Sequence, residues 1–232
     1  MIKRPRAVLF DYDGVLVASE PIHLSAWLQL LDELGLPRDQ KIIQAAIGKT
    51  APEILSQILD RYRPGWSAID YPVHQLAQRK NDIYVIIAEQ ELSVYPGVVE
   101  GLQWLRSQKI AVAVVSNGRR KELERTMRHL GLFEQMDEVV SRDDAKASKP
   151  DPTPYLFAAA CLGVEVQDCM AVEDSPTGLE SALMAKIPTA ALMTNFSREA
   201  VERPVPGRPD LQPVWIGQSI IQYFQWIKSL PI

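Results

Sequence analysis

The sequence predicts an α/β protein: a Rossmann-like core with a doubly wound parallel sheet, into which an all-helical unit is inserted. Six short apolar runs rich in β-branched residues, each bounded by polar or turn residues, indicate buried strands. Helical patterns separate most of these runs, and strands that alternate with helices imply right-handed crossovers and parallel pairing. The third observation is one long segment with helical periodicity and no convincing strand.

The predicted elements of the core follow one another in chain order. The strands are residues 7–10, 110–115, 139–140, 170–172, 189–192 and 214–216. The helices are residues 101–108, 121–130, 154–162, 177–185 and 218–227. The proline-rich stretch 203–213 is predicted to be a loop before the last strand.

The strandless segment predicts a helical cap at residues 17–95, which leaves residues 1–16 and 96–232 for the core. Apolar residues recur at helical spacing in three parts of this segment, 24–34, 54–62 and 73–87. Thr50 followed by Glu53 is a capping-box start for the second of these helices. Two linkers would join the cap to the sheet, so we expect a hinge there.

The composition narrows the class of protein. The 232-residue chain is 47% hydrophobic and 23% charged, which suits a globular fold. Its apolar runs are far shorter than the roughly 20 residues of a membrane-spanning helix, and the run after the basic N-terminus is too short for a secretory signal. We therefore expect a cytosolic protein. The net charge is −4 and the basic residues are scattered, which disfavours a nucleic-acid partner. The oligomeric state stays open, and a monomer is compatible with the sequence.

Polar residues follow four of the predicted strands. They are Asp11 and Asp13 after the first, Ser116 and Asn117 after the second, Lys149 after the third, and Glu173 and Asp174 after the fourth. Because ligands bind beyond the carboxyl ends of the strands in an open parallel sheet, these side chains should meet at one rim. A single acid after a strand is more often a helix cap or a turn residue, but four such sets in order point to a site.

Four carboxylates at one rim would raise one another's pKa unless a cation lies among them. Mg²⁺ prefers oxygen ligands and typically shares them with the phosphate oxygens of a substrate. Lys149 adds a positive charge, and Ser116 with the amides after it adds donors suited to phosphoryl oxygens. The residues therefore predict a Mg²⁺ site that receives a small phosphorylated metabolite.

The segment Asp11-Tyr12-Asp13-Gly14-Val15-Leu16 resembles the first motif of the haloacid dehalogenase superfamily. Ser116, Lys149 and the pair Glu173-Asp174 resemble the other three motifs in order, so the resemblance covers essentially the whole chain. Residues 172–182 are similar to a stretch typical of the branch with β-phosphoglucomutase, phosphoglycolate phosphatase and sugar-phosphate phosphatases. That branch carries a helical cap between its first and second motifs.

The resemblance implies that Asp11 is the nucleophile that becomes an aspartyl-phosphate, and that Asp13 protonates the leaving oxygen and later activates water. Dehalogenases of this fold generally lack the second carboxylate, so Asp13 favours phosphoryl transfer. Ser116 and Lys149 would bind the transferring phosphoryl group, with Asn117 beside them. The metal set would be Asp11, the backbone carbonyl of Asp13, Asp174, and Glu173 either as a ligand or holding a bound water.

The cap bears on the choice between a phosphatase and a mutase. Lys80 matches a substrate-contacting lysine of β-phosphoglucomutase, and His23 matches a residue of that enzyme's first cap helix, so both are candidates for substrate binding. The position where that enzyme presents an arginine to the second phosphate is Ala51 here, although Lys49 or Arg119 could substitute. Because a mutase must hold two phosphates, the missing arginine favours hydrolysis. The prediction is therefore a Mg²⁺-dependent phosphatase, with a phosphosugar mutase as the alternative and a catalytically inert binding protein as a third possibility.

Overall fold

The computed structural model describes residues 2–44, 50–203 and 205–232. The chain forms two compact units. The first unit contains Met1–Ala18 and Ser93–Ile232, and the second contains Ser19–Leu92. The predicted boundaries were 16/17 and 95/96. All six strands belong to the first unit, which we call the core unit, and the second is called the helical unit.

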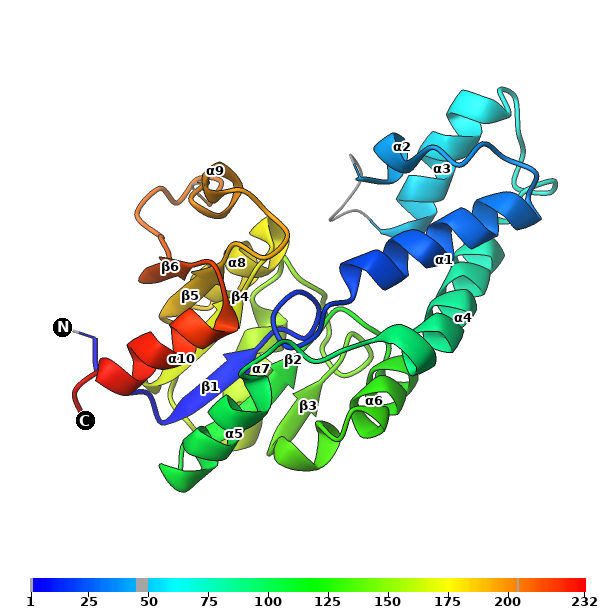
Figure 1. Ribbon diagram of the computed structural model, residues 1–232. Coiled ribbons are helices and arrows are strands. Elements are labelled where there is room, and N and C mark those ends of the chain that lie inside the picture. The colour runs from blue at the N-terminus through cyan, green and yellow to red at the C-terminus, as the bar shows by residue number, and fades with distance from the viewer. Residues whose placement is uncertain (1, 45–49, 204) are drawn as a thin grey trace. The chain divides into compact units, whose positions relative to one another are not determined.

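The core unit is built on a six-stranded parallel sheet with the order β3-β2-β1-β4-β5-β6 (Figure 1). The strands are β1 (Ala7–Phe10), β2 (Ala111–Val115), β3 (Glu138–Val140), β4 (Cys169–Glu173), β5 (Thr189–Leu192) and β6 (Trp215–Gly217). The predicted doubly wound α/β fold is confirmed. In the register, Leu9 of β1 lies opposite Ala113 of β2 on one side and Ala171 of β4 on the other.

Helices cover both faces of this sheet. They are α5 (Val98–Ser107), α6 (Arg120–His129), α7 (Thr153–Leu162), α8 (Pro176–Met184), α9 (Arg198–Val201) and α10 (Ile220–Ser229), with short 3₁₀ turns η1 (Phe133–Gln135) and η2 (Val166–Asp168). Alternate side chains of β1 point to the two faces of the sheet, as the strand period of two requires. Leu9 joins a cluster that includes residues of α7 and α8, whereas the ring of Phe10 lies 6.1 Å from those of Tyr223 and Phe224 in α10.

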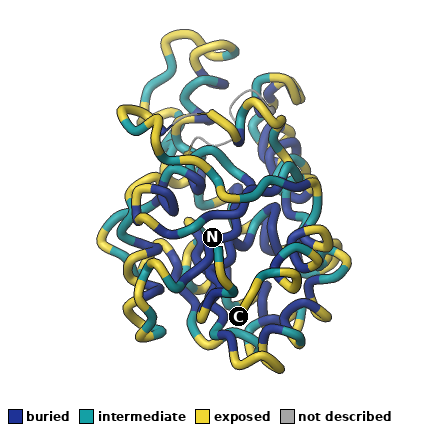
Figure 2. Tube along the Cα trace, turned by 90° about the vertical axis from the view of Figure 1, so that its left-hand side faces the viewer, coloured by how far each residue is buried: buried dark blue, intermediate teal, exposed yellow. Residues whose placement is uncertain are grey.

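Burial on both faces explains why the strands are so apolar. All residues of β1, β4 and β5 are buried, and Figure 2 shows dark blue concentrated in the interior of the molecule. A strand covered on both faces has no polar side, so its sequence is a continuous apolar run instead of an alternating one. The first polar residue beyond such a strand therefore marks the rim.

The helical unit contains α1 (Glu20–Glu33), α2 (Gln40–Gln44), α3 (Ala51–Tyr62) and α4 (Val73–Glu91), and α4 packs against both α1 and α3. The predicted capping box is confirmed: Glu53 accepts a hydrogen bond from the backbone N–H of Thr50 at 2.7 Å. In the described part of the chain, no helix is both long and apolar enough to cross a membrane.

The two linkers between the units are paired with each other. Ala18 N donates to Ser93 O at 3.0 Å, and Tyr95 N donates to Leu16 O at 2.9 Å, on either side of an antiparallel bridge between Val17 and Val94. The chain thus leaves the core unit and returns to it at the same place. A hinge at these linkers stays a prediction.

Candidate active site

The strand order has a topological switch point between β1 and β4. From β1 the chain first extends the sheet through β2 and β3 on one side and then through β4, β5 and β6 on the other. Ligands of open α/β sheets bind at such a switch point, beyond the carboxyl ends of the two central strands. Asp11 directly follows β1, and Glu173 and Asp174 lie at the end of β4. Carboxylate oxygens of these three residues lie within 4.8 Å of one another.

Lys149 is the cation at the centre of this site. Its buried ammonium group donates to Asp11 Oδ1 at 2.6 Å, to Glu173 Oε1 at 2.6 Å and to the Val115 carbonyl at 2.8 Å. These three bonds use all three protons of the ammonium group. Burial alone would lower the pKa of Lys149, but the carboxylates of Asp11 and Glu173 outweigh it and raise that pKa above the ordinary value. Lys149 is therefore a permanent positive charge beside Asp11.

Glu173 is fully buried and firmly anchored. Besides Lys149, the hydroxyl of Tyr155 donates to its Oε1 at 2.8 Å, while its Oε2 accepts from the backbone N–H of Asp174 at 3.2 Å. The first turn of α8 passes so close that a Cβ added at Gly178 would lie 1.9 Å from Oε1. Burial and the Glu173 charge raise the pKa of Tyr155, so its hydroxyl stays protonated and remains a donor.

Asp174 is held by the loop that follows β5. Asn195 Nδ2 donates to Asp174 Oδ2 at 2.9 Å, and Thr194 Oγ1 donates to the Gly14 carbonyl at 2.6 Å. Gly14 has φ +77° and lies directly against Asp174, because a Cβ there would lie 2.1 Å from Oδ2. A side chain at position 14 would therefore be excluded by both conformation and space.

Burial, reinforced by the neighbouring acids, raises the pKa of two carboxyl groups of the site, Asp11 and Asp174. Burial raises the pKa of Asp174 to about 7, and the Glu173 charge adds to the effect. Burial also raises the pKa of Asp11 well above its usual value; Lys149 opposes this, and the neighbouring acids reinforce it. A protein without a metal ion thus holds these carboxylates at a cost in free energy that a cation would relieve.

A hard divalent cation fits this donor set. Three carboxylates with oxygens inside 4.8 Å, mostly buried, provide the oxygen ligands that such an ion prefers. Within the described residues this compact set does not include the side chain of Asp13, which is half-buried two residues after Asp11.

Two residues predicted to bind the phosphoryl group, Ser116 and Asn117, are held in place by hydrogen bonds to the backbone of nearby loops. Ser116 is buried, and its Oγ accepts from the backbone N–H of Gly118 at 3.0 Å. Asn117 pairs with the backbone of Lys149: its Oδ1 accepts from Lys149 N at 3.0 Å and its Nδ2 donates to Lys149 O at 3.2 Å. This pairing ties the second and third loops of the rim together. Arg119 is exposed at the start of α6.

In the helical unit, His23 and Lys80 form a pair of their own. Lys80 Nζ lies 2.7 Å from His23 Nδ1, and the His23 ring stacks on Tyr84 with 4.2 Å between ring centroids. Burial and the Lys80 charge lower the pKa of His23 well below its usual value, so its ring is neutral and Nδ1 accepts from the ammonium group. Lys49, the third candidate from this unit, lies outside the described residues.

Three side chains of the site were not predicted from the sequence: Tyr155, Thr194 and Asn195. Tyr155 lies in a helix made almost entirely of apolar residues, so nothing in the sequence marks its hydroxyl as functional. Thr194 and Asn195 follow the fifth strand, and extending the rule for strand ends to that strand would have found them.

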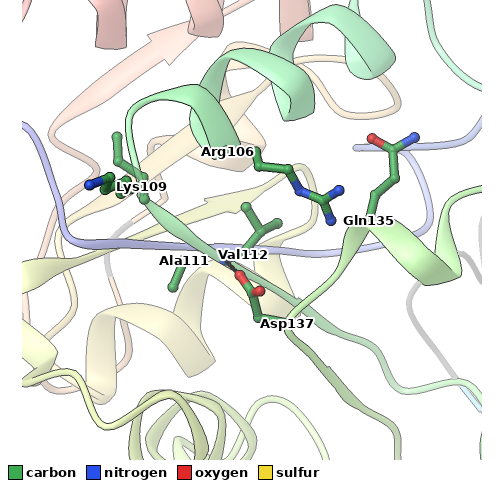
Figure 3. Close-up of a pocket in the computed structure, with 7 residues that line it drawn as sticks. Arg106, Lys109, Ala111, Val112, Gln135 and Asp137 are labelled. Atoms are coloured by element: carbon green, nitrogen blue, oxygen red, sulfur yellow. Dashed lines mark hydrogen bonds between the residues drawn. The ribbon is translucent and has the colours of Figure 1, made fainter.

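A separate pocket of about 260 Å³ lies at the amino end of β2, whereas the acids lie at the carboxyl ends of their strands (Figure 3). It is lined by Arg106, Lys109, Ile110, Ala111, Val112, Gln135 and Asp137. Asp137 Oδ2 accepts from the backbone N–H of Val112 there at 2.8 Å, which fixes the edge of the strand. None of the residues that line this pocket belongs to the acidic site.

The sheet order and the acids at its switch point define an α/β protein whose ligand site lies at the carboxyl ends of the strands. Residues 5–186 match the family model described as haloacid dehalogenase-like hydrolase, and the chain belongs to that family.

Curated relatives include phosphatases and a mutase. The chain is 28% identical over 235 residues to a phosphoglycolate phosphatase of Nitrosococcus oceani, covering 99% of this chain and 98% of the relative. It is 27% identical over 178 residues to the β-phosphoglucomutase of Bacillus subtilis, covering 76% of this chain and 78% of the relative. The crystal structure of a β-phosphoglucomutase from Clostridium difficile has the same fold, with a TM-score of 0.75, 23% identity and 97% and 96% of the two chains covered.

Proposed function

We propose that this protein is a Mg²⁺-dependent phosphatase that hydrolyses a small phosphorylated metabolite through an aspartyl-phosphate on Asp11. The observation that carries the proposal is the contact of Lys149 Nζ with Asp11 Oδ1 at 2.6 Å, next to the oxygens of Glu173 and Asp174. A nucleophilic carboxylate needs positioning and charge neutralisation more than intrinsic reactivity when it attacks a phosphoryl group. The fixed cation and the acid cluster supply both.

In the first step Asp11 attacks the phosphorus of the bound monoester. A new O–P bond forms on Asp11 as the bond to the leaving alcohol breaks, and Asp13 gives the departing oxygen its proton. In the second step water attacks the same phosphorus while Asp13 takes a proton from it. Inorganic phosphate leaves, and the Asp11 carboxylate is restored.

The remaining residues of the site bind the phosphoryl group and the metal ion. Ser116 and Lys149 bind the phosphoryl oxygens, for which Lys149 exchanges one of its three present acceptors, and Lys149 also offsets the charge on Asp11. Asp11, the Asp13 carbonyl and Asp174 would hold the metal ion, with Glu173 ligating it or orienting a bound water. When bound, Mg²⁺ neutralises charge that the acids and the phosphoryl oxygens would otherwise leave exposed to one another.

The test is hydrolysis of p-nitrophenyl phosphate with and without Mg²⁺. We expect turnover with the ion, its loss on chelation and its recovery when Mg²⁺ is returned. Asp11→Asn should abolish turnover, whereas Asp210→Asn, at an exposed loop position of the core unit, should not. Activity without a divalent ion, or activity that survives in Asp11→Asn, would overturn the assignment.

A covalent intermediate gives a second, independent readout. Acid-quenched protein, digested and analysed by mass spectrometry, should carry a phosphoryl group on the peptide that contains Asp11. Asp13→Asn should slow both the formation and the breakdown of this species, because it removes the proton donor and acceptor. A phosphoryl group on any other residue would contradict the mechanism.

The substrate class follows from the relatives and stays part of the proposal. Similarity to phosphatases of small phosphorylated metabolites favours a panel of phosphoglycolate, fructose 1-phosphate, 2-deoxyglucose 6-phosphate and β-glucose 1-phosphate. Release of inorganic phosphate from each would be compared at equal concentration. The compound with the highest kcat/KM defines the class, and uniformly weak release would mean that the panel misses the physiological substrate.

A mutase is the second candidate, favoured by the Lys80 and His23 pair and by the similarity to β-phosphoglucomutase. Against it stands Ala51 in place of the arginine that would grip a second phosphate. Incubation with β-glucose 1-phosphate and a trace of the bisphosphate separates the two functions. Glucose 6-phosphate as the product would establish the mutase, and free phosphate would establish the phosphatase.

A further inference from the structure

Tyr155 is a fully buried tyrosine of the core unit, and its hydroxyl contacts an acid of the active site. It lies on α7, in the buried cluster that this helix forms with strands of the sheet, and has no exposed surface. Its hydroxyl donates to Glu173 Oε1 at 2.8 Å, and the ammonium group of Lys149 lies 5.0 Å from the centre of its ring. Tyr155 therefore contacts both members of the buried ion pair.

The hydroxyl of Tyr155 shares one acceptor atom with Lys149. Glu173 Oε1 accepts from Lys149 at 2.6 Å and from Tyr155 at 2.8 Å, while the same ammonium group also reaches Asp11 Oδ1. A second donor on Oε1 satisfies part of the negative charge of Glu173. The lysine is then less strongly bound to Glu173, and more of its charge is available at Asp11.

We infer that Tyr155 is a positioning residue, which sets how Lys149 divides its charge between Glu173 and the nucleophile Asp11. The inference rests on the proposed phosphatase function and deepens it. Without the hydroxyl, Glu173 draws Lys149 toward itself and away from the place where the transferring phosphoryl group binds. The loss should therefore appear more strongly in the transition state, where phosphoryl charge develops, than in substrate binding.

The sequence supplies a matched pair of variants for the test. Tyr155→Phe removes one oxygen and leaves the ring to fill the same space. Tyr223→Phe does the same at a second fully buried tyrosine, in α10, whose hydroxyl has no hydrogen-bond partner among the residues that the structure describes. Both variants remove a buried hydroxyl from the core unit, and only the first removes a donor to the active site.

The measurements are kcat and KM for p-nitrophenyl phosphate and the inhibition constant of vanadate, which mimics the phosphoryl transition state. For Tyr155→Phe we expect kcat to fall about tenfold and the vanadate constant to rise in parallel, because a hydrogen bond to a charged group is lost while Lys149 remains. KM should stay within about twofold. Tyr223→Phe should keep all three values, and urea unfolding of both variants checks that each is folded.

A second arm uses Glu173→Gln as the background. An amide oxygen is uncharged, so the bond from Tyr155 to it is weaker, and Tyr155→Phe should then cost less than about threefold in kcat. Equal costs in the two backgrounds would show that the hydroxyl acts by another route and would overturn the inference. So would wild-type kcat and vanadate inhibition in Tyr155→Phe, or equal losses in Tyr155→Phe and Tyr223→Phe. If the wild-type protein itself hydrolyses nothing, the proposed function fails instead.

Discussion

Gly178 makes the sharpest prediction about stability. It lies in the first turn of α8, where alanine is normally the better helix former, yet a Cβ at this position would lie 1.9 Å from Glu173 Oε1 and 2.0 Å from Glu173 Cδ. The Glu173 side chain has no room to move aside freely, because Lys149 and Tyr155 hold its carboxylate inside the core. Gly178→Ala should therefore displace the buried acid from its donors.

The magnitude follows from two opposing terms. Replacing glycine by alanine inside a helix stabilises a protein by about 1 kcal/mol. Breaking a buried ion pair costs about 3–5 kcal/mol. Because the second term is larger, Gly178→Ala should lower the free energy of unfolding by about 2–4 kcal/mol. Urea unfolding at 25 °C, followed by far-UV circular dichroism, measures this difference through the transition midpoint.

A second background isolates the cause. In Glu173→Ala the obstructing carboxylate is absent, so adding Gly178→Ala should cost nothing or stabilise the protein by up to about 1 kcal/mol. An equal loss in both backgrounds would mean that α8 itself rejects the methyl group. A Gly178→Ala protein that is as stable as the wild type would refute the reasoning about Glu173.

Two further predictions concern charge. Lys149→Met should lower kcat by at least about 10²-fold and destabilise the protein by about 3–5 kcal/mol, because Asp11 and Glu173 lose their buried cation. Lys121→Met, at an exposed position, is the control, and equal activity in the two variants would contradict this role. His23 has a folded-state pKa well below the unfolded value of 6.5, so the unfolded state takes up the proton first. Stability should be full above about pH 6.5 and fall as the pH drops toward the folded pKa. His23→Gln should flatten this part of the curve in urea titrations, and an unchanged slope would exclude His23 as its source.

The sheet was predictable because its strands are buried on both faces. Residues 7–10 and 189–192 have the predicted bounds. Asp11 directly follows the first apolar run, and Pro188 directly precedes the second. The last helix was predicted at 218–227 and observed at Ile220–Ser229, with Ser219 as its N-cap. The short helices Gln40–Gln44 and Arg198–Val201 were missed, because four or five residues cannot show a helical period.

The residues of the site that directly follow a strand could be predicted from the sequence. Those that lie on helices could not be predicted to contact the site. The sequence placed Asp11, Glu173 and Asp174 at one rim, and the structure brings their oxygens together. It gave no indication that Tyr155 on an apolar helix would donate to Glu173, because that contact depends on which face of α7 meets the sheet. It likewise did not predict that His23 would contact Lys80, since that pairing depends on the packing of α1 against α4.

The pairing of the linkers has a consequence for how the chain could be shortened. Ala18 and Ser93 are hydrogen-bonded neighbours beside an antiparallel bridge, and chain segments paired in this way lie about 5 Å apart. A two-residue turn is enough to connect such segments. The whole helical unit, Ser19–Leu92, is therefore inserted at a single place in the core unit. A chain in which a short turn replaced this unit would keep every strand of the sheet and all the acids at its rim.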